Sequence, residues 1–437
     1  MFLALLLASG VAARPAERPV AAFEVVHYDA TVEPDLAGRT VTGRVAIDLL
    51  STAASLETVD LDIGALTIDA VRMEGAALEF TQSERRLHAR LKAPVTRGAK
   101  RRFAVEYHGS PRYGLEFVPE KSQMYTIFST SQWLPCIDAP GDKATLRLTL
   151  ILPKGLRVVA NGRSVSTRPL SRDRVGHEWR LDEPAPTYTF GFAAGRFTET
   201  TDKQGGTWLR YLSTDASAAQ LRTIFADTKD MLAFFEDRSG VRYDGASYTQ
   251  ALVEKTIGQE LFGFSLMSEE YGRSVLNEPR TVGLIAHELA HQWWGNRVTC
   301  RDWTHFWLNE GFATFMAAAY REKRFGHEAY LKDVEGWRSR YEGVKAAGKD
   351  RSLVFPDWNK PTSDDRALVY QKGALVLHEL RERVGEAGFW KGLRAYTRAH
   401  RRGSVVTADF ERAMEESTGQ DLFAFFNQWV YLGPGRP

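Results

Sequence analysis

The stretch HELAH, residues 287–291, carries the strongest signal in the chain, and Glu310 follows it after eighteen intervening residues. Residues four apart on a helix share one face, so His287 and His291 can reach one metal ion. Glu288 lies one step round from His287, close enough to contact a water without being a ligand. This H-E-x-x-H arrangement is typical of zinc hydrolases. Glu310 supplies a third ligand, which leaves the fourth position open, as in catalytic zinc sites.

The residues around this motif favour a metal-binding site over a solvated surface helix that binds no metal. Six aromatic side chains crowd the stretch: Trp293, Trp294, Trp303, Phe306, Trp307 and Phe312. Unligated histidines and glutamates would be poorly placed among such apolar neighbours. We therefore predict one Zn²⁺ per chain, held by His287, His291 and Glu310.

Several motifs resemble the M1 zinc aminopeptidases, the gluzincin group in which a glutamate is the third ligand. HELAHQWWGN (residues 287–296) and WLNEGFATF (307–315) carry the likeness, and PCIDAP (135–140) and YQKGA (370–374) resemble further segments of that family. The likeness covers nearly all of the chain from about residue 23 onward. It implies a saddle-shaped β domain followed by a thermolysin-like catalytic domain.

The resemblance also assigns the catalytic roles. Glu288 is expected to take a proton from the attacking water and to deliver it to the leaving amine. The attack creates an oxyanion, which needs a hydrogen-bond donor besides the metal. Tyr370 matches the tyrosine that supplies this donor in the family; without that context it would be an ordinary aromatic residue of the core or rim.

Two residues match positions that contact substrate in the resembled family. Glu260 matches the glutamate that binds the N-terminal ammonium by charge-assisted hydrogen bonds. The loop reads IGQEL over residues 257–261, so three positions differ from the family's Gly-x-Met-Glu-Asn. Gln123 lies near a substrate-contacting Gln or Glu of the family, one position out of register; an uninvolved loop glutamine is an equal interpretation.

These observations favour a zinc aminopeptidase that removes N-terminal residues from peptides with a free amine. A zinc endopeptidase is the alternative if Glu260 does not face the substrate. A third hypothesis is a metal-free peptide-binding protein that keeps the fold alone. The intact zinc ligands, Glu288 and Tyr370 weaken this third hypothesis.

Composition narrows the class of protein further. A length of 437 residues predicts two domains. Lys and Arg number 57 against 55 Asp and Glu, so no basic field for nucleic acid is expected. Cys136 and Cys300 are the two cysteines, which excludes a disulfide framework and a cysteine-based zinc site. We expect two free, buried thiols. The sequence does not predict the oligomeric state.

The N-terminus resembles a secretory signal. An apolar run, residues 2–7, precedes small residues that end at Ala13, although a basic segment before the run is missing. We predict a signal peptide over residues 1–13 and export to the periplasm or medium; the alternative is a disordered extension on a cytoplasmic protein. No segment is long enough to span a bilayer, so stable membrane insertion is not expected.

Periodicity divides the remaining chain into two parts and predicts the α+β class. Residues 14–205 show alternating apolar and polar positions, typical of an antiparallel β saddle or sandwich, and Asn161-Gly162 indicates a hairpin turn. Residues 206–437 form the mainly helical catalytic domain, with Gly326 and Gly385 as helix ends. The predicted helices are Ala218–Glu236, Thr281–Trp294, Asn309–Arg324, His327–Ala346, Ala367–Val384, Gly388–Ala399 and Thr407–Ser417.

Larger members of the resembled family continue past the catalytic domain with a helical C-terminal domain that narrows access to the zinc. This chain ends at Pro437 and resembles a short form that lacks it. We therefore expect a more open cleft, or one closed by a partner subunit.

Overall fold

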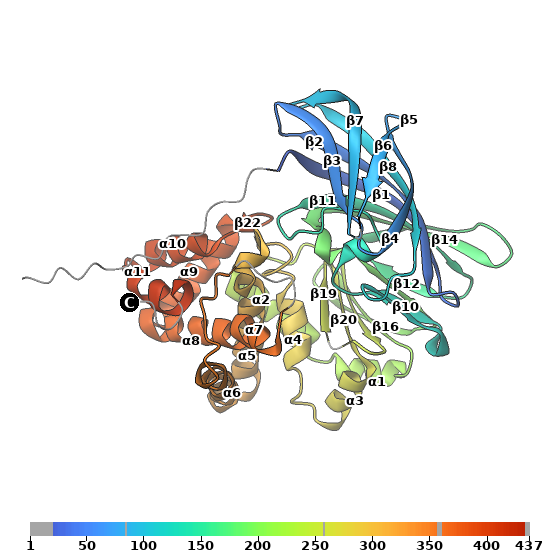
Figure 1. Ribbon diagram of the computed structural model, residues 1–437. Helices are drawn as coiled ribbons and strands as arrows, with labels where there is room; N and C mark the ends of the chain where they lie inside the picture. Colours follow the sequence, from blue (N-terminus) through green and yellow to red (C-terminus); the bar gives the residue numbers. More distant parts are fainter. Residues whose placement is uncertain (1–20, 84, 257, 356–360, 433–437) are drawn as a thin grey trace, which may run out of the picture.

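The computed structural model describes residues 21–83, 85–256, 258–355 and 361–432. Strands dominate the first half and helices the second, which confirms the predicted α+β class (Figure 1). The predicted signal peptide and Ile257 of the predicted amine-binding loop lie outside the described residues. Cys136 and Cys300 are both buried and free, as predicted.

An eight-stranded sheet forms the body of the β domain. Its inward side chains alternate with outward polar ones, so that one face is buried in an apolar core. The pairs are antiparallel except for β1 and β11, which run parallel. The order is β13 (Arg163–Pro169), β14 (Arg174–Pro186), β11 (Lys143–Pro153), β1 (Phe23–Asp35), β2 (Thr40–Ser51), β8 (Lys100–Gly109), β4 (Leu66–Met73) and β5 (Ala76–Ala77).

Two smaller sheets complete this domain. Three strands pair in the order β3 (Ser55–Asp62), β7 (Arg86–Thr96) and β6 (Glu79–Gln82). Four strands pair in the order β12 (Arg157–Ala160), β15 (Phe192–Gly195), β10 (Gln123–Thr126) and β9 (Leu115–Val118).

The predicted hairpin at Asn161-Gly162 is wrong, although the turn exists. Gly162 has a φ of 80°, as such a turn requires. However, β12 pairs with β15 and β13 pairs with β14, so the turn passes the chain from one sheet to another. The side-chain amide of Asn161 donates to the carbonyls of Thr189 and Phe262 at 2.9 and 3.0 Å, which ties the turn to other segments.

A five-stranded sheet begins the catalytic domain. Its order is β16 (Thr198–Gln204), β17 (Thr207–Ser213), β18 (Ser247–Val253), β20 (Phe264–Ser268) and β19 (Gly258–Leu261). The predicted domain boundary between residues 205 and 206 falls in the turn between β16 and β17. Buried residues of this sheet and of the four-stranded sheet share one apolar cluster, which joins the two domains.

Helices gather beside this sheet and enclose the second core, at the lower left of Figure 1. The predicted helix over residues 218–236 is interrupted between α1 and α2, whereas Gly326 and Gly385 end helices as predicted. None of the helices in the described ranges is long and apolar enough to cross a bilayer. The helices are α1 (Ala218–Ile224), α2 (Thr228–Ser239), α3 (Glu269–Asn277), α4 (Gly283–Ala290), α5 (Trp307–Phe325), α6 (His327–Ala346), α7 (Ser363–Ala367), α8 (Gly373–Val384), α9 (Glu386–Ala399), α10 (Thr407–Thr418) and α11 (Phe423–Phe426).

Candidate metal centre and active site

Three potential ligand atoms converge, from His287 in α4, from His291 just after α4 and from Glu310 in α5. The Nε2 atoms of His287 and His291 lie 3.0 Å apart. Oε2 of Glu310, on α5, lies 3.2 Å from the first nitrogen and 3.4 Å from the second. Ligand atoms around a tetrahedral zinc with bonds of about 2.0–2.1 Å stand about 3.3 Å apart. The three predicted ligands therefore already have the spacing that one zinc ion requires.

The surroundings of His291 select the tautomer that a metal needs. Its Nδ1 lies 3.0 Å from the carbonyl oxygen of Trp294, so this nitrogen carries the proton and Nε2 keeps its lone pair. Helix α4 ends at Ala290, and the chain then turns through Gly295, whose φ is 129°. A Cβ at Gly295 would lie 2.8 Å from Nδ1 of His291, so a glycine is required for this close approach.

The charges of the site also call for a cation. Glu288 Oε2 is buried and has no hydrogen-bond partner among the described residues, and the buried Glu310 Oε2 faces the two imidazole nitrogens. Ligand atoms of Glu260, Glu288 and His291 lie within 4.8 Å of one another. Burial raises the pKa of both Glu260 and Glu288, because an ionised carboxylate is poorly solvated there. A divalent cation bound by two imidazoles and Glu310 would offset this buried negative charge.

Tyr370 reaches the same centre from a π-helical turn, Leu368–Lys372, just before α8. A Cβ on Gly311 of α5 would lie 3.0 Å from the backbone of Gly373, so two glycines let the two segments touch. This contact places the ring of Tyr370 parallel to that of His287, with centroids 5.9 Å apart. Burial and the nearby carboxylates raise the pKa of Tyr370, which keeps its hydroxyl protonated and able to donate.

A buried ion pair holds this turn in place. Lys372 Nζ lies 2.8 Å from Asp350 Oδ1, and the two side chains are 2% and 5% exposed. The same ammonium donates to the carbonyl of Arg351 at 2.8 Å. The Lys372 side chain thus anchors the segment two residues after Tyr370.

Replacing Lys372 by Met is expected to lower the free energy of unfolding by about 3–5 kcal/mol, because it leaves the Asp350 carboxylate buried without its cation. Denaturant unfolding at constant zinc concentration measures this loss. The double variant Lys372→Met/Asp350→Asn removes both charges and keeps an acceptor for the Tyr341 hydroxyl, 2.8 Å from Asp350. It should recover most of the stability; a double variant as unstable as the single one would contradict the explanation.

Glu260 lies on β19, which packs against α4, the helix that carries His287 and Glu288. A Cβ on Gly258 would clash with the carboxylate of Glu288, so any larger residue there would displace the end of that side chain. Gln259 donates to Glu260 Oε2 at 2.8 Å and accepts from the backbone N–H of Phe128 at 2.8 Å. One oxygen of the predicted amine-binding carboxylate is therefore already hydrogen-bonded by the residue that replaces the expected methionine.

The structure does not bring Gln123 to the surface of the site. Its side chain is fully buried in β10, and its Oε1 accepts the N–H of Glu254 at 2.8 Å. The remaining Nε2 is a donor, which does not suit an ammonium group. A substrate contact by Gln123 stays a prediction that this arrangement does not support.

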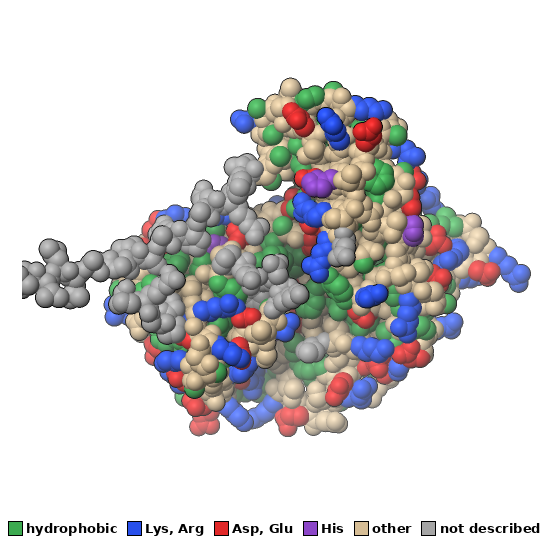
Figure 2. Space-filling model, in the orientation of Figure 1, with side chains coloured by type: hydrophobic (Ala, Val, Ile, Leu, Met, Phe, Trp, Pro, Cys, Tyr) green, Lys and Arg blue, Asp and Glu red, His purple; other side chains and the backbone are tan. Residues whose placement is uncertain are grey.

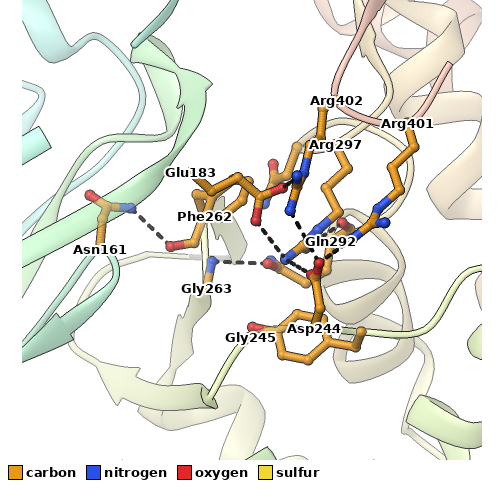
Figure 3. Close-up of polar contacts among 12 residues, drawn as sticks. Asn161, Glu183, Asp244, Gly245, Phe262, Gly263, Gln292, Arg297, Arg401 and Arg402 are labelled. Carbon is orange, nitrogen blue, oxygen red and sulfur yellow. Dashed lines mark hydrogen bonds and ion pairs between the residues drawn. The ribbon is translucent and has the colours of Figure 1, made fainter. Parts of the chain in front are cut away.

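A polar network joins the chain just after Glu260 to Gln292, next to His291, and to Asn161 of the β domain (Figure 3). Gln292, next to His291, accepts from the N–H of Gly263 at 2.9 Å and donates to the carbonyl of Leu261 at 3.0 Å. The guanidinium of Arg297 donates to the Gln292 carbonyl at 3.0 Å. Direct hydrogen bonds thus join the segment that contains His291 and Gln292 to the strand of Glu260.

Arg297 is also the centre of an ion-pair cluster that spans the two domains. Its guanidinium lies 3.5 Å from Glu183 of β14 and 3.0 Å from Asp244. Arg402 bonds the same two carboxylates, and Arg401 pairs with Asp244 (Figure 3). Displacement of one domain against the other would break these contacts, so the cluster ties β14 to the catalytic domain.

Several residues at the cleft had no signal in the sequence. Tyr188, which enters from the β domain, donates to the carbonyl of Gly295 at 3.3 Å and accepts from Asn309 at 3.1 Å. Phe128 is 52% exposed and lines the same cavity as Tyr370. Figure 2 shows the molecule hollowed between the β domain and the helices, with hydrophobic side chains inside the hollow. Only spatial convergence of distant segments identifies these residues.

Comparisons with known proteins place this architecture in one family. Residues 24–189 match the model of the peptidase M1 N-terminal domain, and residues 225–429 match that of the peptidase family M1 domain. Aminopeptidase N of Lactococcus lactis is 28% identical over 96% of this chain and 52% of its own length. The chain spans about half the length of the curated relatives it matches.

Solved structures match over nearly their whole length. The M1 zinc metallopeptidase of Deinococcus radiodurans superposes with a TM-score of 0.80 and 24% identity, covering 95% of each chain. A mutant of that protein bound to a Tyr-Ser-Ala substrate gives the same TM-score of 0.80. At this identity the likeness concerns the fold, which has the same two-part order of β domain and helical domain. Together with the two matching family models, these similarities show that the chain belongs to peptidase family M1.

Proposed function

We propose that this protein is a zinc-dependent aminopeptidase with one zinc ion per chain, which hydrolyses the first peptide bond of substrates with a free N-terminus. The observation that carries the proposal is the tetrahedral spacing of His287, His291 and Glu310, with the Glu260 carboxylate beside His291. The Lactococcus lactis relative is an aminopeptidase N, and the Deinococcus radiodurans enzyme binds a tripeptide, which supports peptides as the substrate class.

Each group near the metal ligands has a step to perform. Zinc, when bound, would polarise the substrate carbonyl and make a water molecule more acidic. Glu288, whose Oε2 has no partner in the described structure, accepts a proton from the attacking water and passes it to the leaving amine. Tyr370 donates its hydroxyl proton in a hydrogen bond to the oxyanion. Glu260 accepts hydrogen bonds from the substrate ammonium and thereby sets the position of cleavage.

The requirement for a free amine tests this proposal. On an aminoacyl anilide we expect N-acetylation to remove nearly all turnover, because the capped nitrogen has no charge to pair with Glu260. In Glu260→Gln the difference between free and capped substrates should shrink by about 10–100-fold, the range of a charge-assisted hydrogen bond. Steady-state kcat/KM for both substrates measures it, and Glu270→Gln, at an exposed position of α3, is the matched control.

A zinc endopeptidase is the second candidate, and one observation favours it. Gln259 already binds Glu260 Oε2, so part of the amine-binding capacity is occupied within the protein. An endopeptidase would cleave the capped and free substrates at similar rates. That result would replace the aminopeptidase proposal while leaving the zinc chemistry intact.

A further inference from the structure

A cavity of about 680 Å³ opens beside Tyr370, and its walls come from both domains. Arg85 lines it from the β domain and Arg366 lines it from α7. The volume lies within the range of about 300–1,000 Å³ that is usual for small-ligand sites. The cavity is therefore large enough to hold a short peptide.

Neither arginine is neutralised within the described part of the protein. Both side chains are exposed, and neither forms an ion pair or a side-chain hydrogen bond with a described residue. The acidic neighbours of Arg366 in α7 are already engaged, since Asp364 pairs with Arg340 at 3.0 Å and Asp365 pairs with Arg351. Arg366 is thus left with its full charge facing the cavity.

The carboxylates that line the cavity are satisfied by other groups. Asp62 lies 2.7 Å from Arg86 and also accepts the N–H of Asp138 at 3.0 Å. Asp138 accepts the N–H of Ser131 at 3.1 Å. Neither carboxylate pairs with Arg85 or Arg366, so an anionic group of the ligand is the natural partner for the two guanidinium groups.

The position of Arg366 relates this charge to the scissile bond. It precedes Tyr370 by four residues, which is about 6 Å of helix axis. An extended peptide advances about 3.3 Å per residue. In a substrate whose scissile bond lies beside Tyr370, a carboxylate one or two residues beyond that bond would therefore lie beside the guanidinium of Arg366. The planar guanidinium can bind a carboxylate through two hydrogen bonds.

We propose that Arg366, assisted by Arg85, binds a carboxylate in the leaving part of the substrate, so that the enzyme prefers dipeptides and tripeptides with a free C-terminus. This inference rests on the proposed aminopeptidase function, since Glu260 and the metal must hold the other end of the peptide. The carboxylate can come from the C-terminus or from an acidic side chain at the same distance.

Three peptides separate these sources: Ala-Ala-Ala as the free acid, its C-terminal amide, and the amide of Ala-Ala-Glu. We expect kcat/KM of the wild type to be about 10–100-fold higher for the acid than for its amide, mostly through KM. The Ala-Ala-Glu amide should recover part of this advantage if a side chain can reach the arginines. In Arg366→Gln the ratio of acid to amide should fall close to one, and Arg366→Lys should keep an intermediate ratio.

Arg383→Gln, an equal loss of charge at an exposed position near the end of α8, should keep the wild-type ratio. Binding of the acid and the amide to Glu288→Gln, measured by calorimetry with and without Arg366→Gln, gives a readout without turnover. Equal kinetics and equal binding for acid and amide would overturn the carboxylate site, while cleavage of an aminoacyl anilide would still support the aminopeptidase. Failure to cleave the anilide and all three peptides would overturn the proposed function itself.

Discussion

Glu288→Gln is expected to lower kcat by about 10²–10⁴-fold while the zinc content stays at the wild-type level. The amide has the shape of the carboxylate but cannot accept a proton from water. The side chain of Glu288 is buried, and its Oε2 has no hydrogen-bond partner in the described structure, so its loss should disturb little else. Steady-state kinetics on an aminoacyl anilide and metal analysis of the purified variant measure the two quantities.

The control for this variant is Glu382→Gln, at an exposed position of α8. It should retain both the activity and the metal of the wild type. If Glu288→Gln lost its zinc, Glu288 would be a ligand rather than a proton acceptor, as its proximity to Glu260 and His291 would also permit. If it kept both zinc and rate, another group would have to accept the proton, and the mechanism given above would be wrong.

Removal of the metal is expected to abolish turnover and to lower the melting temperature. A ligand at 1,000 times its Kd adds about 4.1 kcal/mol to the stability of the native state, so the thermal transition should fall by several degrees on chelation. In the absence of zinc the carboxyl groups of Glu260, Glu288 and Glu310 remain buried beside one another without the cation's charge. Stoichiometric zinc should restore both the activity and the transition temperature.

Variants separate metal binding from non-specific effects of the chelator. Glu310→Gln should bind zinc more weakly and should not regain full activity at stoichiometric zinc, whereas Glu328→Gln, at an exposed position of α6, should behave as wild type. Turnover that persists in chelator, with no zinc in the protein, would contradict the metal centre. Protein that never contains zinc and never turns over substrate would revive the hypothesis of a metal-free peptide-binding protein.

The proposed aminopeptidase activity and the proposed preference for short peptides depend on different parts of the structure. In these proposals zinc and Glu288 act at the scissile bond, Glu260 at the amine, and Arg366 at the far end of the cavity. Since these groups come from separate elements, each can be changed without removing the others. The ion-pair cluster around Arg297 ties the β domain to the catalytic domain, and both domains contribute walls to the cavity.

Local patterns were sufficient where the physical cause is local. The spacing of His287 and His291 follows from the helical repeat, and the ends of α5 and α8 follow from the conformational freedom of Gly326 and Gly385. The turn at Asn161-Gly162 was recognised for the same reason. Its partner strands were not, because pairing depends on distant segments that the turn's own residues do not specify.

The sequence by itself determined the α+β class, the family likeness and the three candidate metal ligands, since residue type and spacing carry that information. Only the tertiary structure decided that Gly311 meets Gly373 and so brings Tyr370 beside His287, that Gln123 is buried, and that Gln259 holds Glu260. Only the tertiary structure also placed Arg85 and Arg366 in one cavity. These contacts join residues far apart in the chain, and their geometry depends on how whole domains pack rather than on any local repeat.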